Sequence, residues 1–460
     1  MKPECRQRIR YIACDYVLLN IGWLAFNVVR FHSLPHTWPG TFAEFFNTPP
    51  VLLGQLLVPL MALALYALSG YYNLPFDKSR VDDLLNTAGT SAVTAVAVFF
   101  AVLINDDIPE RLLNYQLLAI LWALLALPVY LGRATVTARA KRMIKDGRLR
   151  FPTLVLGSGD KAMRLAERLR RIPTAMGFAI EEYVDTADTQ AIDRAVLAAA
   201  GGRIQNVILA DDRDDNTHTA ALLGRFIPTG CSVFMVPDLY NLLTVRPRVS
   251  SVANEPLVNI TSGGMSALTS NMKRLGDIAV SAFALVALAP VFAAIAIAVK
   301  ADSNGPVFYS QERVGLHKRR FRIHKFRTMR PDAEAAGPQL SRESDPRITR
   351  TGAVLRKYRL DELPQFWDVL RGRMSLVGPR PERAFYLEQM ERRAPYVSLI
   401  HRVRPGITSW GMVRYGYAGS IDEMLERLPY DLLYIENVSL SVDLRIMLHT
   451  IDTVVTGKGL

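Results

Sequence analysis

The residues of this chain with the clearest chemical potential are two adjacent carboxylates, Asp361 and Glu362, which lie among arginines in the C-terminal part of the sequence. Neighbouring carboxylates repel each other unless a metal ion or several cations offset their charge. Arg356 and Arg359 precede the pair, and Arg380 follows it between two prolines that restrict its backbone. Acids surrounded by cations in this way are typical of a site that handles a divalent metal ion and phosphate groups.

An ordinary explanation of such a pair is a solvated helix face whose acids pair with nearby arginines. The surrounding sequence favours a site instead. Pro364 follows the pair closely, and the Gly-Pro-Arg-Pro-Glu segment 378–382 is too stiff for a casual surface loop. Upstream, residues 321–329 alternate cationic and apolar side chains, which is typical of a β-strand.

A series of C-terminal segments resembles the bacterial polyprenyl-phosphate sugar-phosphate transferases, which start glycan assembly on a lipid carrier. The large, multi-domain members of that family fit best. The segments occur in the family's order: a hydrophobic helix broken by a proline, Lys325-Phe326-Arg327-Thr328-Met329, Leu360-Asp361-Glu362-Leu363-Pro364-Gln365, Val377-Gly378-Pro379-Arg380-Pro381-Glu382, Arg404-Pro405-Gly406-Ile407-Thr408 and Tyr430-Asp431-Leu432-Leu433-Tyr434-Ile435-Glu436-Asn437. The resemblance implies a small α/β, mostly helical catalytic domain over residues 301–460.

The resemblance also implies a reaction, in which a sugar 1-phosphate moves from a UDP-sugar to undecaprenyl phosphate and UMP is released. This step would initiate exopolysaccharide or other surface glycan synthesis. Following the family, Asp361 would attack the sugar-bearing phosphorus to give an aspartyl phosphosugar, and Glu362 would support the metal or move a proton. Mg²⁺ would bridge Asp361 and the diphosphate. Other positions match the family's phosphate-contacting cations and a recurring acid, namely Lys325, Arg356, Arg380 and Asp443.

Structural roles stay open for some of these residues. Arg356 could form a salt bridge with Glu362, and Asp443 could hold a nearby arginine instead of touching substrate. The sequence also departs from the family pattern, because Ser409-Trp410-Gly411-Met412-Val413 stands where Gly-Trp-Ala-Gln-Val is common, and Asn437 lacks a following Trp. These changes leave Asp361 intact and could alter sugar choice or membrane seating.

The composition indicates a membrane protein that carries soluble parts. Half of the 460 residues are apolar, and the mean hydropathy is +0.13. Apolar stretches near 11–29, 51–71, 84–104 and 115–131 approach the roughly 20 residues that a spanning helix needs. We therefore predict a four-helix transmembrane bundle over residues 1–135. No small-residue cleavage site follows the first stretch, which argues against a cleaved signal peptide.

The distribution of positive charge predicts the orientation of this bundle. Cations precede the first span, lie between the second and third, and follow the fourth in a run from Arg133 to Arg150, whereas the other two loops carry only Arg30 and Arg111 near their ends. The positive-inside rule places such segments, and both ends of the bundle, in the cytoplasm. The cations before and between the spans are Lys2, Arg6, Arg8, Arg10, Lys78 and Arg80.

A fifth apolar segment, Leu275 to Val299, contains Pro290, which removes a helical hydrogen bond and favours a bend. We predict a re-entrant membrane helix over residues 270–300, since a complete crossing would export the arginine-rich segment that follows. The resembling family uses such a helix. The ordinary alternative is a kinked span.

Residues 151–262 predict a Rossmann-like α/β domain with a parallel sheet, because short apolar runs alternate with amphipathic helices. The expected elements are 153–156, 161–171, 178–184, 206–209 and 232–236. Gly157 and Gly159 follow the first strand in a Gly-x-Gly-x-x-Ala pattern, which suggests dinucleotide binding. Glu181, Glu182 or Asp185 fits the ribose-binding acid only loosely, so a turn that binds nothing is the alternative.

Other function classes fit the sequence less well. Membrane nucleotide-sugar dehydratases share the layout of four spans and a Rossmann domain, but their Tyr-x-x-x-Lys pair is absent. A membrane-anchored nucleotide-binding sensor or scaffold would need an inactive C-terminal segment, whereas the acids and their cations are intact. The net charge of +12 is explained by cation clusters, including one from Arg313 to Arg404, that anionic lipids would attract. Zinc-finger spacing and RNA-binding motifs are missing, so nucleic acid is not an expected partner.

The expected location is the bacterial inner membrane, with several spans and a catalytic domain that faces the cytoplasm. The expected partners are a UDP-sugar, undecaprenyl phosphate, inner-membrane lipids and the polysaccharide assembly machinery, and a homodimer is left open. The three cysteines are too few and too scattered for a disulfide framework or a zinc site.

Overall fold

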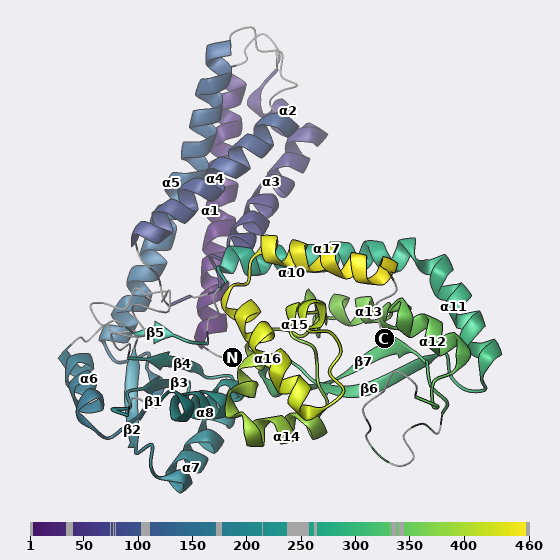
Figure 1. Cartoon of the computed structure of the whole chain (residues 1–460). Coiled ribbons are helices and arrows are strands. Elements are labelled where there is room, and N and C mark those ends of the chain that lie inside the picture. The colour runs from purple at the N-terminus through teal and green to yellow at the C-terminus, as the bar shows by residue number, and fades with distance from the viewer. Residues whose placement is uncertain are drawn as a thin grey trace. The chain divides into compact units, whose positions relative to one another are not determined.

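The computed structural model divides the chain into two compact units (Figure 1). One comprises Met1–Arg150, Leu169–Gly177 and Ser250–Glu255, and the other comprises Phe151–Arg168, Phe178–Val249 and Pro256–Leu460. The structure describes residues 3–33, 40–73, 75–76, 78, 80–102, 111–171, 177–213, 215–236, 257–261, 265–331, 333, 337, 339 and 345–456. The predicted cation Lys2 and the boundaries at 104 and 262 lie outside these ranges.

The first unit contains the predicted bundle of long helices. Its elements are α1 (Pro3–Ser33), the short α2 (Phe42–Phe46), α3 (Pro49–Leu68), α4 (Arg80–Ala101) and α5 (Arg111–Lys145). Four of them, α1, α3, α4 and α5, are long and apolar enough to cross a membrane, which agrees with the four predicted spans. Helices α1 and α5 extend beyond their predicted apolar stretches at both ends, whereas α3 ends at Leu68, before the predicted limit at 71. Arg6, Arg8 and Arg10, which were predicted to precede the first span, lie within α1 itself.

A buried ion pair joins the first and last helices of this unit. The Arg133 Nη2 atom lies 2.6 Å from the Asp15 Oδ2 atom, and both side chains are fully buried. Arg133 also donates to Thr87 Oγ1 at 2.8 Å, and the Tyr72 hydroxyl donates to Asp15 at 2.7 Å. Because an unpaired charge is costly away from water, this network favours the arrangement in which α1, α4 and α5 meet here.

The second unit begins with an α/β domain. Its elements are β1 (Phe151–Leu156), α6 (Asp160–Arg171), β2 (Phe178–Val184), α7 (Thr189–Ala200), β3 (Asn206–Leu209), α8 (Asn216–Phe226), the 3₁₀ helix η2 (Ile227–Thr229), β4 (Ser232–Met235) and β5 (Val258–Asn259). The sheet order is β2-β1-β3-β4-β5, with parallel pairing except between β4 and β5. The predicted parallel sheet is confirmed, and its central strands are almost entirely buried, as their apolar runs require.

The bend predicted near Pro290 is also present. Helix α10 (Ala267–Ala287) and helix α11 (Ala289–Asp302) meet at an angle of 61° across Leu288. Pro290 lies in the first turn of α11, where its missing N–H needs no helical partner. The two helices therefore form one broken hydrophobic segment.

The C-terminal domain follows α11. It begins with the antiparallel hairpin of β6 (Phe308–Val314) and β7 (Arg320–Phe326), joined through η3 (Leu316–Lys318). The strand predicted from alternation is therefore confirmed for the first part of 321–329. The later elements are α12 (Arg350–Lys357), η4 (Leu360–Glu362), α13 (Gln365–Leu370), β8 (Ser375–Val377), α14 (Ala384–Arg393), η5 (Pro395–Arg402), β9 (Gly406–Thr408), α15 (Trp410–Arg414), α16 (Ile421–Glu436) and α17 (Leu440–Thr456).

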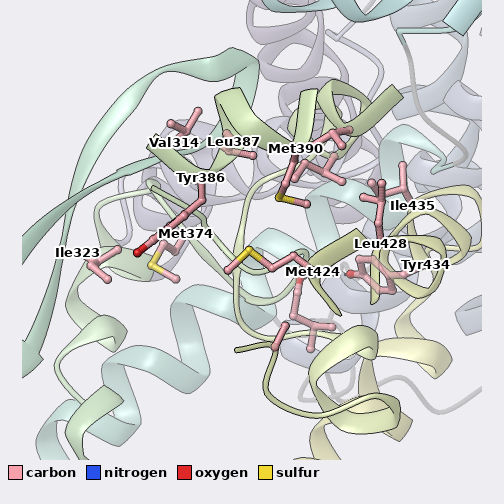
Figure 2. Packing of buried hydrophobic residues seen from close by; sticks show 14 of the residues in the cluster. Val314, Ile323, Met374, Tyr386, Leu387, Met390, Met424, Leu428, Tyr434 and Ile435 are labelled. Carbon is pink, nitrogen blue, oxygen red and sulfur yellow. Dashed lines mark hydrogen bonds between the residues drawn. The ribbon is translucent and has the colours of Figure 1, made fainter. Parts of the chain in front are cut away.

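A large hydrophobic core joins the hairpin to later helices of this domain (Figure 2). Figure 2 shows Val314 and Ile323 of the hairpin in the same cluster as Met390 of α14 and Leu428 of α16. Helix α10 is attached to the domain by polar contacts, because Arg274 donates to the carbonyl oxygens of Val369 and Leu370 at 2.8 and 3.1 Å. The core thus fixes the hairpin, whose strand β7 carries Lys325, relative to the elements that follow.

Candidate active site

The two acids lie on a short turn between two helices. Helix α12 ends at Lys357, and Arg359 adopts a left-handed backbone conformation with φ 52° and ψ 24°. This reversal lets Leu360–Glu362 form a single 3₁₀ turn before α13 begins. Asp361 and Glu362 are each only 8% exposed, so the explanation as a solvated helix face is wrong.

The cations around the turn lie closer to Glu362 than to Asp361. The Lys325 Nζ atom lies 2.5 Å from Glu362 Oε1 but 3.9 Å from Asp361 Oδ2. The Arg380 Nη1 atom lies 3.5 Å from the same Glu362 oxygen. Among the described residues, Glu362 is therefore the counter-ion of two cations, while Asp361 has one long ionic contact.

The pKa shifts of the two acids agree with this unequal pairing. Burial alone would raise the pKa of Glu362, but the charges of Lys325, Arg380 and Arg359 outweigh it and hold that pKa well below its usual range. Burial raises the pKa of Asp361, and the neighbouring Glu362 charge adds to the rise while Lys325 opposes it. The pair thus consists of a stabilised anion beside a more basic carboxylate.

Both acids line a pocket of about 340 Å³. Lys325, Arg356 and Arg380 line it too, so the structure brings together all the predicted site residues of the C-terminal domain except Asp443. Much of the basic cluster that was assigned to a membrane surface also faces this pocket. Its further cations there are Arg313, Arg327, Arg330, Arg347, Arg359 and Arg383.

The structural role considered for Arg356 was a salt bridge with Glu362, but its partner is a different residue. Its Nε atom donates to Thr328 Oγ1 at 2.9 Å, and within the described ranges it forms no ion pair with Glu362. The Arg356 Nη1 atom is buried and has no hydrogen-bond partner there. A buried guanidinium with an unused donor is suited to an anionic ligand.

Asp443 lies outside the residues that line the pocket. Its Oδ2 atom is 2.6 Å from Lys273 Nζ of α10, and its Oδ1 atom accepts from the Tyr434 hydroxyl at 2.7 Å. The partner is therefore a lysine rather than the arginine that was considered. This contact joins α17 to α10, which run side by side in Figure 1.

Arg359 and Met412 also line the pocket, and neither was assigned a role from the sequence. Arg359 was noted only as a nearby cation, and Met412 only as a departure from the family pattern. The Met412 sulfur lies 3.2 Å from Arg380 Nη1 and 3.9 Å from Arg359 Nη1. The departure from the family pattern at Met412 was the one sequence feature that pointed to these contacts, because Arg359, Arg380 and Met412 come from separate segments of the chain.

In the α/β domain, a carboxylate of the protein itself, that of Asp212, lies at the turn that contains Gly157 and Gly159. A side chain at Gly159 would collide with the Asp212 carboxylate, whose Oδ1 atom accepts from the Lys161 backbone amide at 3.1 Å. Gly157 has φ 128° and lies against the Ala210 carbonyl. The ligand-binding role of Gly157 and Gly159 stays a prediction, and Asp212 opposes a phosphate at this helix start.

The acids fit a metal ion that a substrate would help to hold. In the part of the chain that the structure describes, no group of at least three His, Cys, Asp or Glu side chains could hold a metal ion. Mg²⁺ is commonly bound through one or two carboxylates together with substrate phosphates. Asp361 suits this role because its ionic contact is long, whereas Glu362 is engaged by Lys325.

Comparisons with known proteins agree on one family. A family model described as "Bacterial sugar transferase" matches residues 268–457. The UDP-N-acetylgalactosamine-undecaprenyl-phosphate N-acetylgalactosaminephosphotransferase of Aeromonas hydrophila is 38% identical over 256 residues, which are 55% of this chain and 60% of that protein. The UDP-glucose:undecaprenyl-phosphate glucose-1-phosphate transferase of Klebsiella pneumoniae is 28% identical over 427 residues, which are 89% and 90% of the two chains.

A third relative consists almost wholly of the matched part. The exopolysaccharide production protein PSS of Rhizobium leguminosarum bv. phaseoli is 40% identical over 197 residues, which are 41% of this chain and 98% of that protein. In contrast, the match spans less than two thirds of the Aeromonas relative and 56% of the Escherichia coli UDP-glucose:undecaprenyl-phosphate glucose-1-phosphate transferase. The family model itself covers the domain that contains Asp361 and Glu362.

Proposed function

The chain belongs to the bacterial sugar transferase family, and we propose that it transfers a sugar 1-phosphate from a UDP-sugar to undecaprenyl phosphate with release of UMP. The names of the relatives support both substrates. The proposal concerns UDP-sugars as a class, because those names differ in the sugar. Neither a sensor nor a dehydratase is favoured by these similarities.

The observation that carries the proposal is the unequal pairing of the two buried acids. Glu362 is held by Lys325 at 2.5 Å, which leaves Asp361 as the carboxylate free to react. Because burial raises the pKa of Asp361, its carboxylate is more basic than a solvated one. Carboxylates act as nucleophiles towards phosphorus in other enzymes, so this side chain suits covalent catalysis.

The proposed reaction has two displacement steps at one phosphorus atom. In the first, an Asp361 carboxylate oxygen bonds to the sugar-bearing phosphorus, and the phosphoanhydride bond to UMP breaks. In the second, an oxygen of the lipid phosphate attacks the same phosphorus, and the bond to Asp361 breaks. The carboxylate is restored, and the sugar remains on a lipid diphosphate.

The remaining charged groups position the anions and offset their charge. Arg356 and Arg380 line the pocket beside Asp361, and a guanidinium fork matches paired phosphate oxygens. Lys325 fixes Glu362 and so keeps that acid from competing with Asp361. Positioning and charge neutralisation are the main requirements for an exchange between two phosphoanhydrides.

We propose that Asp361 also contributes a ligand to Mg²⁺, with the substrate phosphates completing its coordination. When bound, such an ion reduces the repulsion between a carboxylate and an anionic diphosphate. Glu362 would support this arrangement through its fixed position next to Asp361.

The contacts of α10 and α11 support a re-entrant segment. Near its start, Arg274 of α10 donates to the Val369 carbonyl at 2.8 Å. Near its end, the Ser303 carbonyl accepts from Arg327 at 2.7 Å. Both partners belong to the C-terminal domain, whereas a full crossing would separate the ends by about 30 Å of hydrocarbon. We infer that the segment returns to the side it entered.

This topology favours the bacterial inner membrane with the C-terminal domain in the cytoplasm. The basic loops between the candidate spans support that orientation, and UDP-sugars are available on that side. The β2-β1-β3-β4 order of parallel strands supports a doubly wound α/β class, to which Rossmann-like folds belong. The lipid-linked product would then pass to the polysaccharide assembly machinery.

The proposal is tested by UMP release from a panel of UDP-sugars, with purified full-length protein, Mg²⁺ and undecaprenyl phosphate. Asp361→Asn should lower the rate by about a thousandfold or more, because it removes the nucleophile. Asp452→Asn makes the same change at an exposed position and should leave the rate unchanged. Equal rates in Asp361→Asn and wild type would rule out Asp361 as the nucleophile.

A further inference from the structure

Arg359 has a backbone conformation that an arginine does not favour. It follows the helix cap Tyr358, its amide donates to the Arg356 carbonyl at 3.1 Å, and its φ is 52°. Helices often end with one left-handed residue at this position, and that residue is usually glycine or asparagine. Of the described non-glycine residues with positive φ, the others are His317 and Lys318 in the hairpin turn. Arg359 thus lies next to the acids in a backbone conformation that its residue type disfavours.

The Arg359 side chain faces the pocket without a strong partner. Its hydrogen bond is to the Met412 sulfur at 3.9 Å, and it forms no ion pair with a carboxylate among the described residues. A thioether is only a weak acceptor, so most of the guanidinium donors are available to a ligand.

Arg359 and Arg380 approach the same sulfur atom. Arg380 Nη1 lies 3.2 Å from Met412 Sδ, and both guanidinium groups line the pocket that contains Asp361. Two guanidinium groups this close repel each other, and an anion between them would relieve the repulsion. A phosphate group provides several oxygens that match the arginine fork.

We propose that Arg359 is a phosphate-binding residue that acts together with Arg380, whose guanidinium contacts the same Met412 sulfur. This proposal rests on the proposed function for the origin of the phosphate, which is the UDP-sugar or the lipid carrier. If Arg359 served only to end the helix, Arg359→Gly would leave phosphate binding unchanged. Glycine accepts φ 52° without steric cost, so Arg359→Gly removes the cation while it suits the backbone better.

The first test measures ligand binding without turnover. Full-length protein in detergent is melted alone, with UDP, and with undecaprenyl phosphate, in the absence of Mg²⁺. Arg359→Gly should melt at or above the wild-type temperature without ligand and lose the stabilisation by one of the two phosphates, which identifies the source. Arg359→Lys should keep part of that stabilisation. Lys357→Ala removes an exposed cation two residues away and should behave as wild type.

The second test measures turnover with the same variants. Arg359→Gly should lower kcat/KM by about 10- to 100-fold, the equivalent of one lost hydrogen bond to a charged group, mainly through the KM of the ligand identified by melting. Unchanged ligand stabilisation in Arg359→Gly, or a lower melting temperature without ligand, would overturn the proposal. So would a wild-type protein that neither phosphate stabilises.

The two proposals can fail separately. If wild-type protein releases no UMP from any UDP-sugar but Arg359→Gly still loses the stabilisation by UDP, the proposed transfer is wrong and the phosphate-binding role of Arg359 stands. If UMP is released and Arg359→Gly is as active as Lys357→Ala, the transfer stands and the role of Arg359 is wrong.

Discussion

Neutralising the two adjacent acids one at a time should change stability in opposite directions. Glu362→Gln removes the counter-ion of Lys325, which lies 2.5 Å away, and of Arg380, which lies 3.5 Å away. The Lys325 and Arg380 side chains are only 17% and 18% exposed, so little solvent would replace the lost negative charge. Removing one partner of a buried ion pair costs about 3–5 kcal/mol.

Asp361→Asn, in contrast, should not lower the stability of the protein. Burial, together with the Glu362 charge, makes the ionised Asp361 unfavourable, as the direction of its pKa shows. The neutral amide removes that penalty and leaves the Lys325–Glu362 contact in place. We therefore expect a melting temperature equal to or above that of the wild type.

The assay is thermal unfolding of full-length protein in detergent, without substrate and with a chelator that removes Mg²⁺. For a domain of this size, about 3–5 kcal/mol corresponds to a fall of about 6–20 °C for Glu362→Gln. Glu362→Asp serves as the control that retains the charge. If Asp361→Asn lowers the melting temperature as much as Glu362→Gln does, the unequal pairing of the two acids is wrong.

Further expectations concern pH, topology and the bundle. Burial raises the pKa of Asp431 to about 6 from 3.8. The native state therefore binds more protons than the unfolded state between these pH values. Its stability falls by about 3 kcal/mol as the pH rises through that window. Asp431→Asn should remove this fall, as measured by melting temperatures at pH 4–8. Leu268→Cys and Ala301→Cys, in a chain without its native cysteines, should react with an impermeant reagent from the same membrane side, and reaction from opposite sides would exclude re-entry. Asp15→Asn and Arg133→Met should each lower the melting temperature through a loss of about 3–5 kcal/mol, and a double variant as unstable as the sum would show that the pair is uncoupled.

Local sequence patterns predicted part of the elements of the fold. The four long helices, the bend beside Pro290 and the strands β1 to β4 follow from hydrophobic runs and from proline chemistry, which act over a few neighbouring residues. The motif segments also identified Asp361 and Arg380, which the structure brings to one pocket. Residue type and short spacing were sufficient for these features.

Contacts between distant segments could not be predicted in the same way. The partner of Asp443 is Lys273, 170 residues away, and the partner of Arg133 is Asp15, 118 residues away. The left-handed conformation of Arg359 contradicts the preference of its residue type. Such features depend on which elements pack together, and a local pattern of hydrophobicity or charge carries no information about that choice.

A covalent intermediate on Asp361 can be sought by mass spectrometry. Full-length protein is mixed with an accepted UDP-sugar and Mg²⁺ without the lipid phosphate, quenched in acid and digested. We expect the peptide that contains Asp361 to gain the mass of one phosphosugar, and Asp361→Asn to show no gain. Turnover on addition of undecaprenyl phosphate, with no such peptide at any quench time or with the added mass on Glu362, would contradict the proposed mechanism.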